Sequence, residues 1–393
     1  MGLILNDLKN ACELEHVCDY VNNRTTSSMN YISTENMLPN KGGISESTII
    51  PPGTTTEYKI GDILISNIRP YFQKIWCADR CGGCSADVLC IRAKENTDSK
   101  YLYYLLSQQA FFDYVMSGAK GCKMPRGDKK QIMQWPVNIP AIDVQKKVVA
   151  ILSSLDNKIR LNRRINDKLE EQAKALFKSW FVDFEPFKGG KFVDSELGLI
   201  PKGWSTGTIY SYIDVIYGAP YKSALFNDKK QGLPLIRIRD LKTYTPQYYT
   251  KEVLPNTEYV ECGDIIAGMD AEFIPHIWRG EKGVLNQRLC KFVPKYDYVS
   301  KYYIYSLVYP KLAFVQSYKV GTTVSHLGKA DIDRFKVIVP PEDIIMQYSK
   351  IVNSYFAEIV KVSNENQILS SLRDTLLPKL MSGELSVEEV SLD

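Results

Sequence analysis

The most regular hydrophobic pattern of this chain lies between Val144 and Trp180, where apolar residues recur at alternating steps of three and four. The positions on this seam are Val148, Leu152, Leu155, Ile159, Asn162, Asn166, Leu169, Ala173, Leu176 and Trp180. The seam predicts an amphipathic helix about 55 Å long, at a rise of about 1.5 Å per residue. Because its apolar stripe is narrow, we expect this helix to need a partner helix.

A second stretch near the C-terminus repeats the seam. Its positions are Val352, Tyr355, Ile359, Val362, Asn366, Leu369, Arg373, Leu376 and Leu380. Asn162 and Asn366 fall at the same heptad phase, and a buried Asn in such a seam selects register at a cost in stability. The residues predicted to pair the helices are Leu155, Ile159, Asn162, Leu169, Leu176, Ile359, Val362, Asn366, Leu369 and Leu376. Periodicity alone also allows two unrelated surface helices, each packed on its own domain.

The two halves of the chain are copies of one another. Gly61-Asp62-Ile63 recurs 202 residues later as Gly263-Asp264-Ile265, and Ile75-Trp76 recurs at the same shift as Ile277-Trp278. The repeat predicts an α+β fold in which a mixed α/β globular domain and a long helix each occur twice. The predicted limits are residues 1–142 and 188–342 for the globular domains and 143–187 and 343–393 for the helical segments.

Composition narrows the class of protein. A chain of 393 residues with 45% hydrophobic content suits two or three soluble domains. No apolar run is long enough to cross a membrane, and the N-terminus lacks a secretory pattern. The nine cysteines follow no disulfide framework, which fits a reducing compartment, so we expect a cytoplasmic protein.

The net charge of +4 is small, but basic residues cluster in 120–130 and 221–242, outside both seams. Such stretches could contact a phosphate backbone, and they could equally be solvated faces.

The chain offers only weak evidence for a catalytic site. Cys77, Cys81 and Cys84 have the spacing of a radical S-adenosylmethionine cluster, and with Cys90 they could form a zinc site. The second copy has Arg279, Gly283 and Asn286 in the places of the first three cysteines, so the same loop is built without them. We therefore expect no metal. The three histidines, His16, His276 and His326, show no ligand or relay spacing.

Several motifs resemble one family. Residues 176–186 (LFKSWFVDFEP), followed by 196–204 (ELGLIPKGW), are similar to the junction between the central helix and the second recognition domain in specificity subunits of Type I restriction-modification systems, the HsdS family. The closing residues 376–385 (LLPKLMSGEL) resemble another recurrent piece of that family. Further shared pieces are Gly61-Asp62-Ile63-Leu64, Ile68-Arg69-Pro70, Asn286-Gln287-Arg288 and Gly321-Thr322-Thr323. One departure is that residues 1–13 lack the Ile-Pro-x-x-Trp sequence that precedes the second domain in this family.

The resemblance implies that each globular domain is a target recognition domain that reads one half of a bipartite, asymmetric DNA sequence. It implies that the helices pair antiparallel as a coiled-coil spacer, set the gap between the half-sites and dock two methyltransferase subunits. Adenine methylation with S-adenosylmethionine would belong to those partners, and ATP-driven translocation and cleavage to restriction subunits. This chain would then bind none of S-adenosylmethionine, Mg²⁺ or ATP, and would be non-catalytic.

DNA contacts are expected from Lys and Arg on phosphates and from Arg, Asn or Gln on base edges. The candidates are Arg69, Lys123, Arg126, Lys129, Lys130, Lys222, Arg237, Arg239, Gln287, Arg288 and Thr323. Two other hypotheses stay open. One is a coiled-coil adaptor that does not read DNA, and the other is a metal-dependent enzyme that uses Cys77, Cys81 and Cys84.

Overall fold

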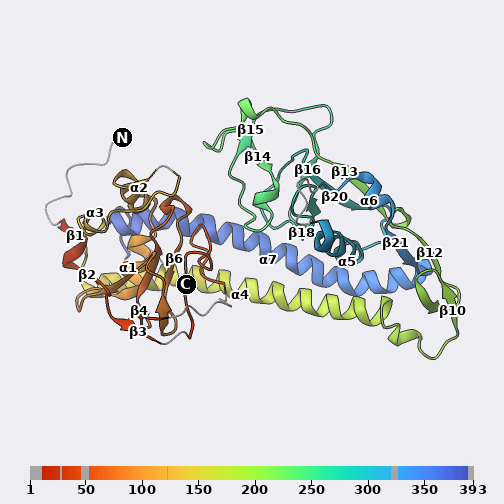
Figure 1. Ribbon diagram of the computed structural model, residues 1–393, viewed down its shortest axis with the longest axis horizontal. Helices are drawn as coiled ribbons and strands as arrows, with labels where there is room; N and C mark the ends of the chain where they lie inside the picture. Colours follow the sequence, from red (N-terminus) through yellow and green to blue (C-terminus); the bar gives the residue numbers. More distant parts are fainter. Residues whose placement is uncertain (1–10, 27–28, 46–52, 122, 320–325, 388–393) are drawn as a thin grey trace. The chain divides into compact units, whose positions relative to one another are not determined.

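The computed structural model describes residues 11–26, 29–45, 53–121, 123–319 and 326–387. The chain divides into two compact units, Met1–Asn157 with Ser371–Asp393, and Lys158–Ser370. Each unit is described by itself. Figure 1 gives the order of the elements along the chain.

A four-stranded antiparallel sheet is the centre of the first unit. Its order is β2 (Cys18–Tyr20), β8 (Val88–Ala93), β5 (Ile63–Ser66) and β6 (Ile75–Cys77). All four residues of β5 are buried, because the strand lies between two others and is covered on both faces. A smaller sheet joins β3 (Arg24–Thr25), β4 (Thr55–Tyr58) and β7 (Gly82–Cys84), and β1 (Cys12–Glu13) pairs with β9 (Pro136–Val137).

Short helices pack against this sheet. They are α1 (Ser99–Leu106), α2 (Gln109–Ser117) and α3 (Lys129–Met133). Asp98 begins α1 by accepting hydrogen bonds from the backbone N–H groups of Lys100 and Tyr101, which the first turn would otherwise leave unpaired. Tyr101 and Phe111 are fully buried in the resulting core.

The second unit repeats this plan. Its main sheet has the order β13 (Ile213–Tyr217), β20 (Leu289–Pro294), β17 (Ile265–Gly268) and β18 (Pro275–Ile277). A second sheet has the order β15 (Tyr249–Thr250), β14 (Leu233–Ile236), β19 (Gly283–Leu285) and β16 (Tyr259–Val260). The remaining pairs are β10 (Phe192–Ser195) with β11 (Gly198–Pro201) and β12 (Ser205–Thr208) with β21 (Lys336–Val339). The helices are α5 (Lys301–Lys319) and α6 (Lys329–Asp333).

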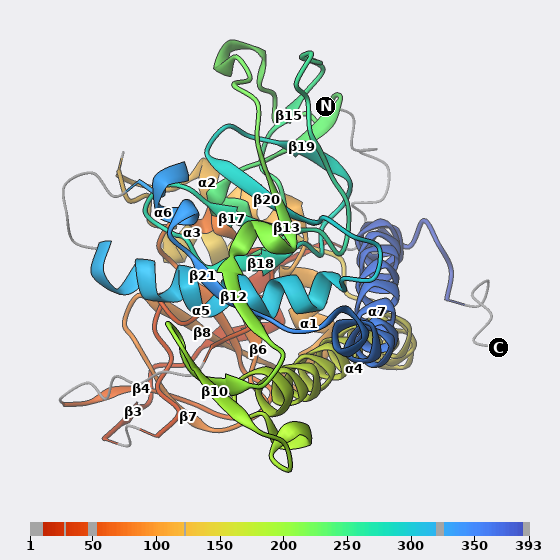
Figure 2. The same cartoon turned by 90° about the vertical axis from the view of Figure 1, so that its right-hand side faces the viewer.

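Two long helices, α4 (Ile142–Phe181) and α7 (Glu342–Ser382), each begin in one unit and end in the other. Within the second unit they lie side by side in both views (Figures 1 and 2), and the paired residue numbers rise on one helix as they fall on the other. They are therefore antiparallel there. The predicted α+β fold, with two mixed domains and two long helices, is confirmed. The limits given to the four segments stay predictions.

No helix in the described ranges is both long enough and apolar enough to cross a membrane.

Candidate nucleic-acid interface

In the first domain, Arg69 and the basic stretch 120–130 are brought together. The backbone N–H of Arg69 donates to the carbonyl oxygen of Pro125 at 2.8 Å, and Ile68 and Arg126 form an antiparallel bridge. Residues more than fifty positions apart thus share one edge of the domain. The predicted candidates of this domain lie on these two adjoining segments.

The side chains on this edge are exposed and partly ion-paired. The Arg126 Nη2 atom lies 3.1 Å from Asp87 Oδ1, and Lys120 Nζ lies 3.1 Å from Asp128 Oδ2. The hydrogen bond from Lys120 lowers the pKa of the Asp128 carboxyl group. The exposed side chains of this edge include Arg69, Lys123, Arg126, Lys129 and Lys130. A cationic edge of this kind suits a phosphate backbone.

In the second domain, three segments meet at the turn between β19 and β20. The backbone N–H of Gln287 donates to Ala219 O at 2.9 Å, and that of Asn286 donates to Ile236 O at 3.2 Å. The turn therefore joins the segments that carry Lys222, Arg237, Arg239, Gln287 and Arg288.

Arg237 differs from its neighbours because it is largely buried. Its guanidinium lies 4.2 Å from the ring centroid of Tyr248, and its Nε atom lies 4.0 Å from Asp240 Oδ2. Burial lowers the pKa of the Arg237 guanidinium, against the attraction of Asp240. The contact with Tyr248 holds the guanidinium in place, and the DNA contact expected of Arg237 stays a prediction. Lys222, Arg239 and Gln287 are exposed, and Thr323 lies outside the described residues.

One acidic residue, Asp270, pairs with two polar side chains beside this turn. Asp270 accepts from Arg288 Nη1 at 2.6 Å through one oxygen and lies 2.7 Å from His326 Nδ1 through the other. Sequence reasoning missed Asp270 and His326, and it also missed Asp87 in the first domain. The internal repeat places these residues on matching segments of the two copies, but it does not show which segments become neighbours.

The predicted helix-pairing residues face one another within each unit. Asn162 Nδ2 donates to Asn366 Oδ1 at 3.0 Å and to Glu365 Oε2 at 2.8 Å, and Asn166 Nδ2 donates to Ser363 Oγ at 3.0 Å. Ile159, Ile359 and Val362 are buried beside them, and Leu169, Leu176 and Leu369 are half-buried. Leu155 and Leu376 are half-buried in the first unit.

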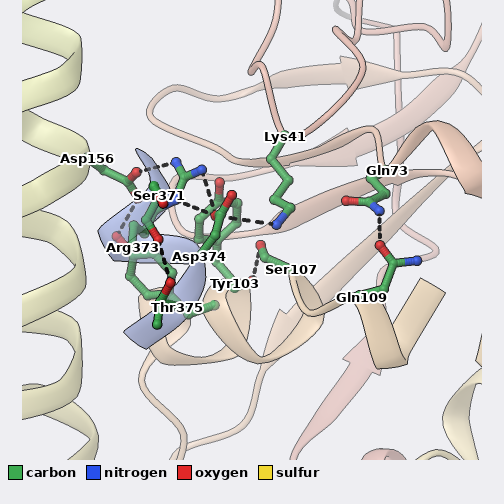
Figure 3. A network of polar contacts seen from close by, with 11 residues as sticks. Lys41, Gln73, Tyr103, Ser107, Gln109, Asp156, Ser371, Arg373, Asp374 and Thr375 are labelled. Carbon is green, nitrogen blue, oxygen red and sulfur yellow. Dashed lines mark hydrogen bonds and ion pairs between the residues drawn. The ribbon is translucent and has the colours of Figure 1, made fainter. Parts of the chain in front are cut away.

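Arg373 occupies a seam position where an apolar residue is usual (Figure 3). Its Nη1 donates to Asp156 Oδ1 at 2.8 Å, and its Nε and Nη2 donate to Asp374 Oδ1. Tyr104 completes the group by donating to Asp156 Oδ2 at 2.8 Å. Burial alone would lower the pKa of Arg373, but the attraction of the two carboxylates outweighs burial and raises it. The cluster ties α4, α7 and α1 together.

The cysteines of the enzymatic alternative do not form a ligand set. Cys77 ends β6, Cys84 ends β7, and Cys81 lies on the exposed turn between them. Burial raises the pKa of the Cys77 thiol to about 11, which disfavours the thiolate that a metal needs. Among the described residues, no group of three or more His, Cys, Asp or Glu side chains could hold a metal ion.

Comparison with known proteins gives this arrangement a context. The sequence matches the family described as "Type I restriction modification DNA specificity domain" over residues 10–171 and 201–370. The chain belongs to this Type I specificity family. The two matched regions contain the two globular domains with their repeated sheets, so the chain carries two specificity domains.

Relatives within the family cover most of the chain. The MjaIX specificity subunit of Methanocaldococcus jannaschii is 28% identical over 76% of this chain and 71% of its own length. The HindI specificity subunit of Haemophilus influenzae is 24% identical over 90% of this chain and 94% of its own length. A solved Type I S subunit from M. genitalium aligns with 96% of this chain and 98% of its own, at 15% identity and a TM-score of 0.46.

Proposed function

We propose that this protein is the DNA-specificity subunit of a Type I restriction-modification complex, in which each specificity domain reads one half of a bipartite target. The family match over both halves of the chain carries the proposal. The exposed basic edge around Arg69 and Arg126, and the polar turn around Arg288, support it. Lys and Arg would supply affinity through phosphates, and fewer side chains would supply specificity through base edges.

Catalysis, on this proposal, belongs to partner subunits. Methyltransferase subunits would bind S-adenosylmethionine and methylate adenine, and restriction subunits would use ATP and Mg²⁺ for translocation and cleavage. The complex would act on cytoplasmic DNA. Two matched helices of 40 and 41 residues would serve as a stiff spacer, since about 60 Å of helix exceeds one DNA turn of about 34 Å.

We further propose that a groove along α7 receives a methyltransferase subunit. The groove has a volume of about 860 Å³, and Phe356, Val360 and Ile368 from α7 line it opposite Cys262 and Lys301. Ile368 is 68% exposed and, with the half-buried Phe356 and Val360, gives the groove an apolar wall of the kind that partner proteins cover. Ile368→Asp should abolish co-purification with the methyltransferase subunit. Val253→Asp is the matched control, because Val253 is 70% exposed on the second domain away from this groove.

The test of function is to co-express the full chain with its methyltransferase subunit in a host that lacks the system, and to map methylated adenines by single-molecule sequencing. A bipartite motif with a fixed gap, absent without this chain, is the expected result. No new methylation from a soluble, associated pair, together with no salt-sensitive binding to duplex DNA, would favour the adaptor function instead.

A further inference from the structure

The two specificity domains share one backbone frame at the polar edge described above. In the first domain, Asn67 N–H donates to Asp87 O at 2.9 Å, and Gly127 N–H donates to Asn67 O at 3.3 Å. In the second domain, the corresponding bonds run from Met269 N–H to Arg288 O at 2.9 Å and from Leu327 N–H to Met269 O at 2.7 Å. Isolated bridges follow the same correspondence. They join Ile68 with Arg126 and Asp270 with His326.

Three side chains stand at matching places on each frame. We name these the corner residues, which are Ile68, Asp87 and Arg126 in the first domain and Asp270, Arg288 and His326 in the second. In the first corner, the ion pair joins Asp87 in the second place with Arg126 in the third place. In the second corner, Asp270 in the first place bonds both Arg288 and His326. The backbone is the same, but the carboxylate moves from the second place to the first, and the guanidinium moves from the third place to the second.

The frame also carries strained backbone in both copies. Arg69 has φ of 51° and Ala271 has φ of 58°, so each corner is followed by a non-glycine residue in the left-handed region. Such a conformation costs about 1–3 kcal/mol and is retained where surrounding structure or function requires it. Because the same strained conformation follows Ile68 and Asp270, the backbone holds the first corner residue of each domain at the same place on the edge.

The corner side chains are accessible and preorganised. Arg126 and Arg288 are 57% and 59% exposed, and each is held by a carboxylate through one guanidinium nitrogen. A guanidinium has five N–H donors in a planar fork, so a carboxylate on one nitrogen orients the others. An oriented fork is what the O6 and N7 acceptors of guanine require.

We propose that the corner residues are the base-reading site of each specificity domain, and that the different placing of the carboxylate and guanidinium makes the two domains read different half-sites. This inference rests on the proposed DNA-specificity function. Asp87 and Asp270 are positioning residues, because they act on the DNA through Arg126 and Arg288. The surrounding exposed residues Lys123 and Lys130 contact phosphates and carry no sequence preference.

The experiment uses the co-expressed chain and methyltransferase subunit with genome-wide mapping of methylated adenine. Arg126→Ala should relax base preference at one position of one half-site by about 10-fold or more and leave the other half-site unchanged. Arg288→Ala should do the same in the opposite half-site. Arg126→Lys keeps the charge but loses the fork, so it should keep binding and lose discrimination.

The matched controls are alanine variants of two exposed, ion-paired residues that are not corner residues. Arg80 pairs with Asp79 in the first domain and Lys282 with Glu261 in the second, at 2.8 and 2.7 Å. Their alanine variants should keep the wild-type motif. Co-purification with the methyltransferase subunit shows that each variant is folded.

The outcomes are distinct. Wild-type motifs from folded Arg126→Ala and Arg288→Ala chains would overturn the inference and leave the specificity function standing. A uniform loss of affinity across sequences, with a salt slope reduced by about one, would also overturn it by showing phosphate contacts. Absence of any bipartite motif with the wild-type chain would instead contradict the proposed function.

Discussion

Replacing Arg373 by alanine should loosen the first unit at the helix pair (Figure 3). The change removes both ion pairs of this side chain and leaves Asp156 with only the Tyr104 hydroxyl among the partners described above. The Arg373 and Asp156 side chains are 19% and 29% exposed, so water replaces the lost partner only in part.

The magnitude follows from that burial. Breaking a fully buried ion pair costs about 3–5 kcal/mol, and partial solvation of Asp156 reduces this to about 2–3 kcal/mol. Lys41 adds little, since its Nζ lies 3.9 Å from the half-exposed Asp374 and burial lowers the pKa of Lys41. A loss of about 2–3 kcal/mol corresponds to about 30- to 150-fold faster local exchange.

Native-state amide hydrogen exchange of the full chain measures this effect. Peptides from residues 371–380 and 101–106 should exchange faster, and peptides from the second unit should not change. Lys379→Ala is the matched control, because Lys379 lies on the same helix in an exposed pair with Glu384 and should change exchange by less than about 5-fold.

Combining Arg373→Met with Asp156→Leu should restore much of the protection, because the largely buried Asp156 carboxylate is removed together with its partner, and the half-exposed Asp374 carboxylate is solvated by water. Exchange that stays within about 3-fold of wild type in Arg373→Ala would refute the reasoning, since it would mean that water satisfies Asp156 fully.

Three further predictions concern the second unit. Arg279→Met should destabilise the second unit by about 2–3 kcal/mol, because Glu170 loses its ion-pair partner and burial already raises the pKa of Glu170. Adding Glu170→Leu should recover much of this loss, as measured by urea unfolding that is followed by amide hydrogen exchange. Asn162→Leu alone should cost about 1–3 kcal/mol, because it leaves Asn366 without its hydrogen-bond partner. Changing both asparagines to Leu should raise stability and permit other registers of the two helices, which crosslinking of single-cysteine variants would detect. His276 is buried, and burial lowers its pKa below the ordinary 6.5. The unfolded chain therefore binds more protons, and the free energy of unfolding should fall as pH decreases from about 6.5 towards the folded pKa. His276→Gln should flatten that part of the pH profile of thermal unfolding, and an unchanged profile would assign the acid sensitivity to another group.

Local periodicity was enough to predict the helices α4 and α7, because apolar residues at three- and four-residue steps share one face of a helix, which must be buried. Periodicity alone left open whether that face packs against a second helix or against its own domain. The internal repeat likewise predicted two equivalent domains, because matched residues at a constant shift require matched strands, and β5 and β17 occupy the same place in their sheets.

Tertiary structure alone decided the polar sites. The first corner joins Ile68, Asp87 and Arg126 only because three loops meet, and no sequence spacing encodes which loop ends become neighbours. Arg373 stands at a seam position where an apolar residue is usual, and only the tertiary structure places Asp156 at 2.8 Å from it. Charge pairing depends on separations of a few ångströms between segments distant in sequence, whereas helix formation depends on neighbours three and four residues away.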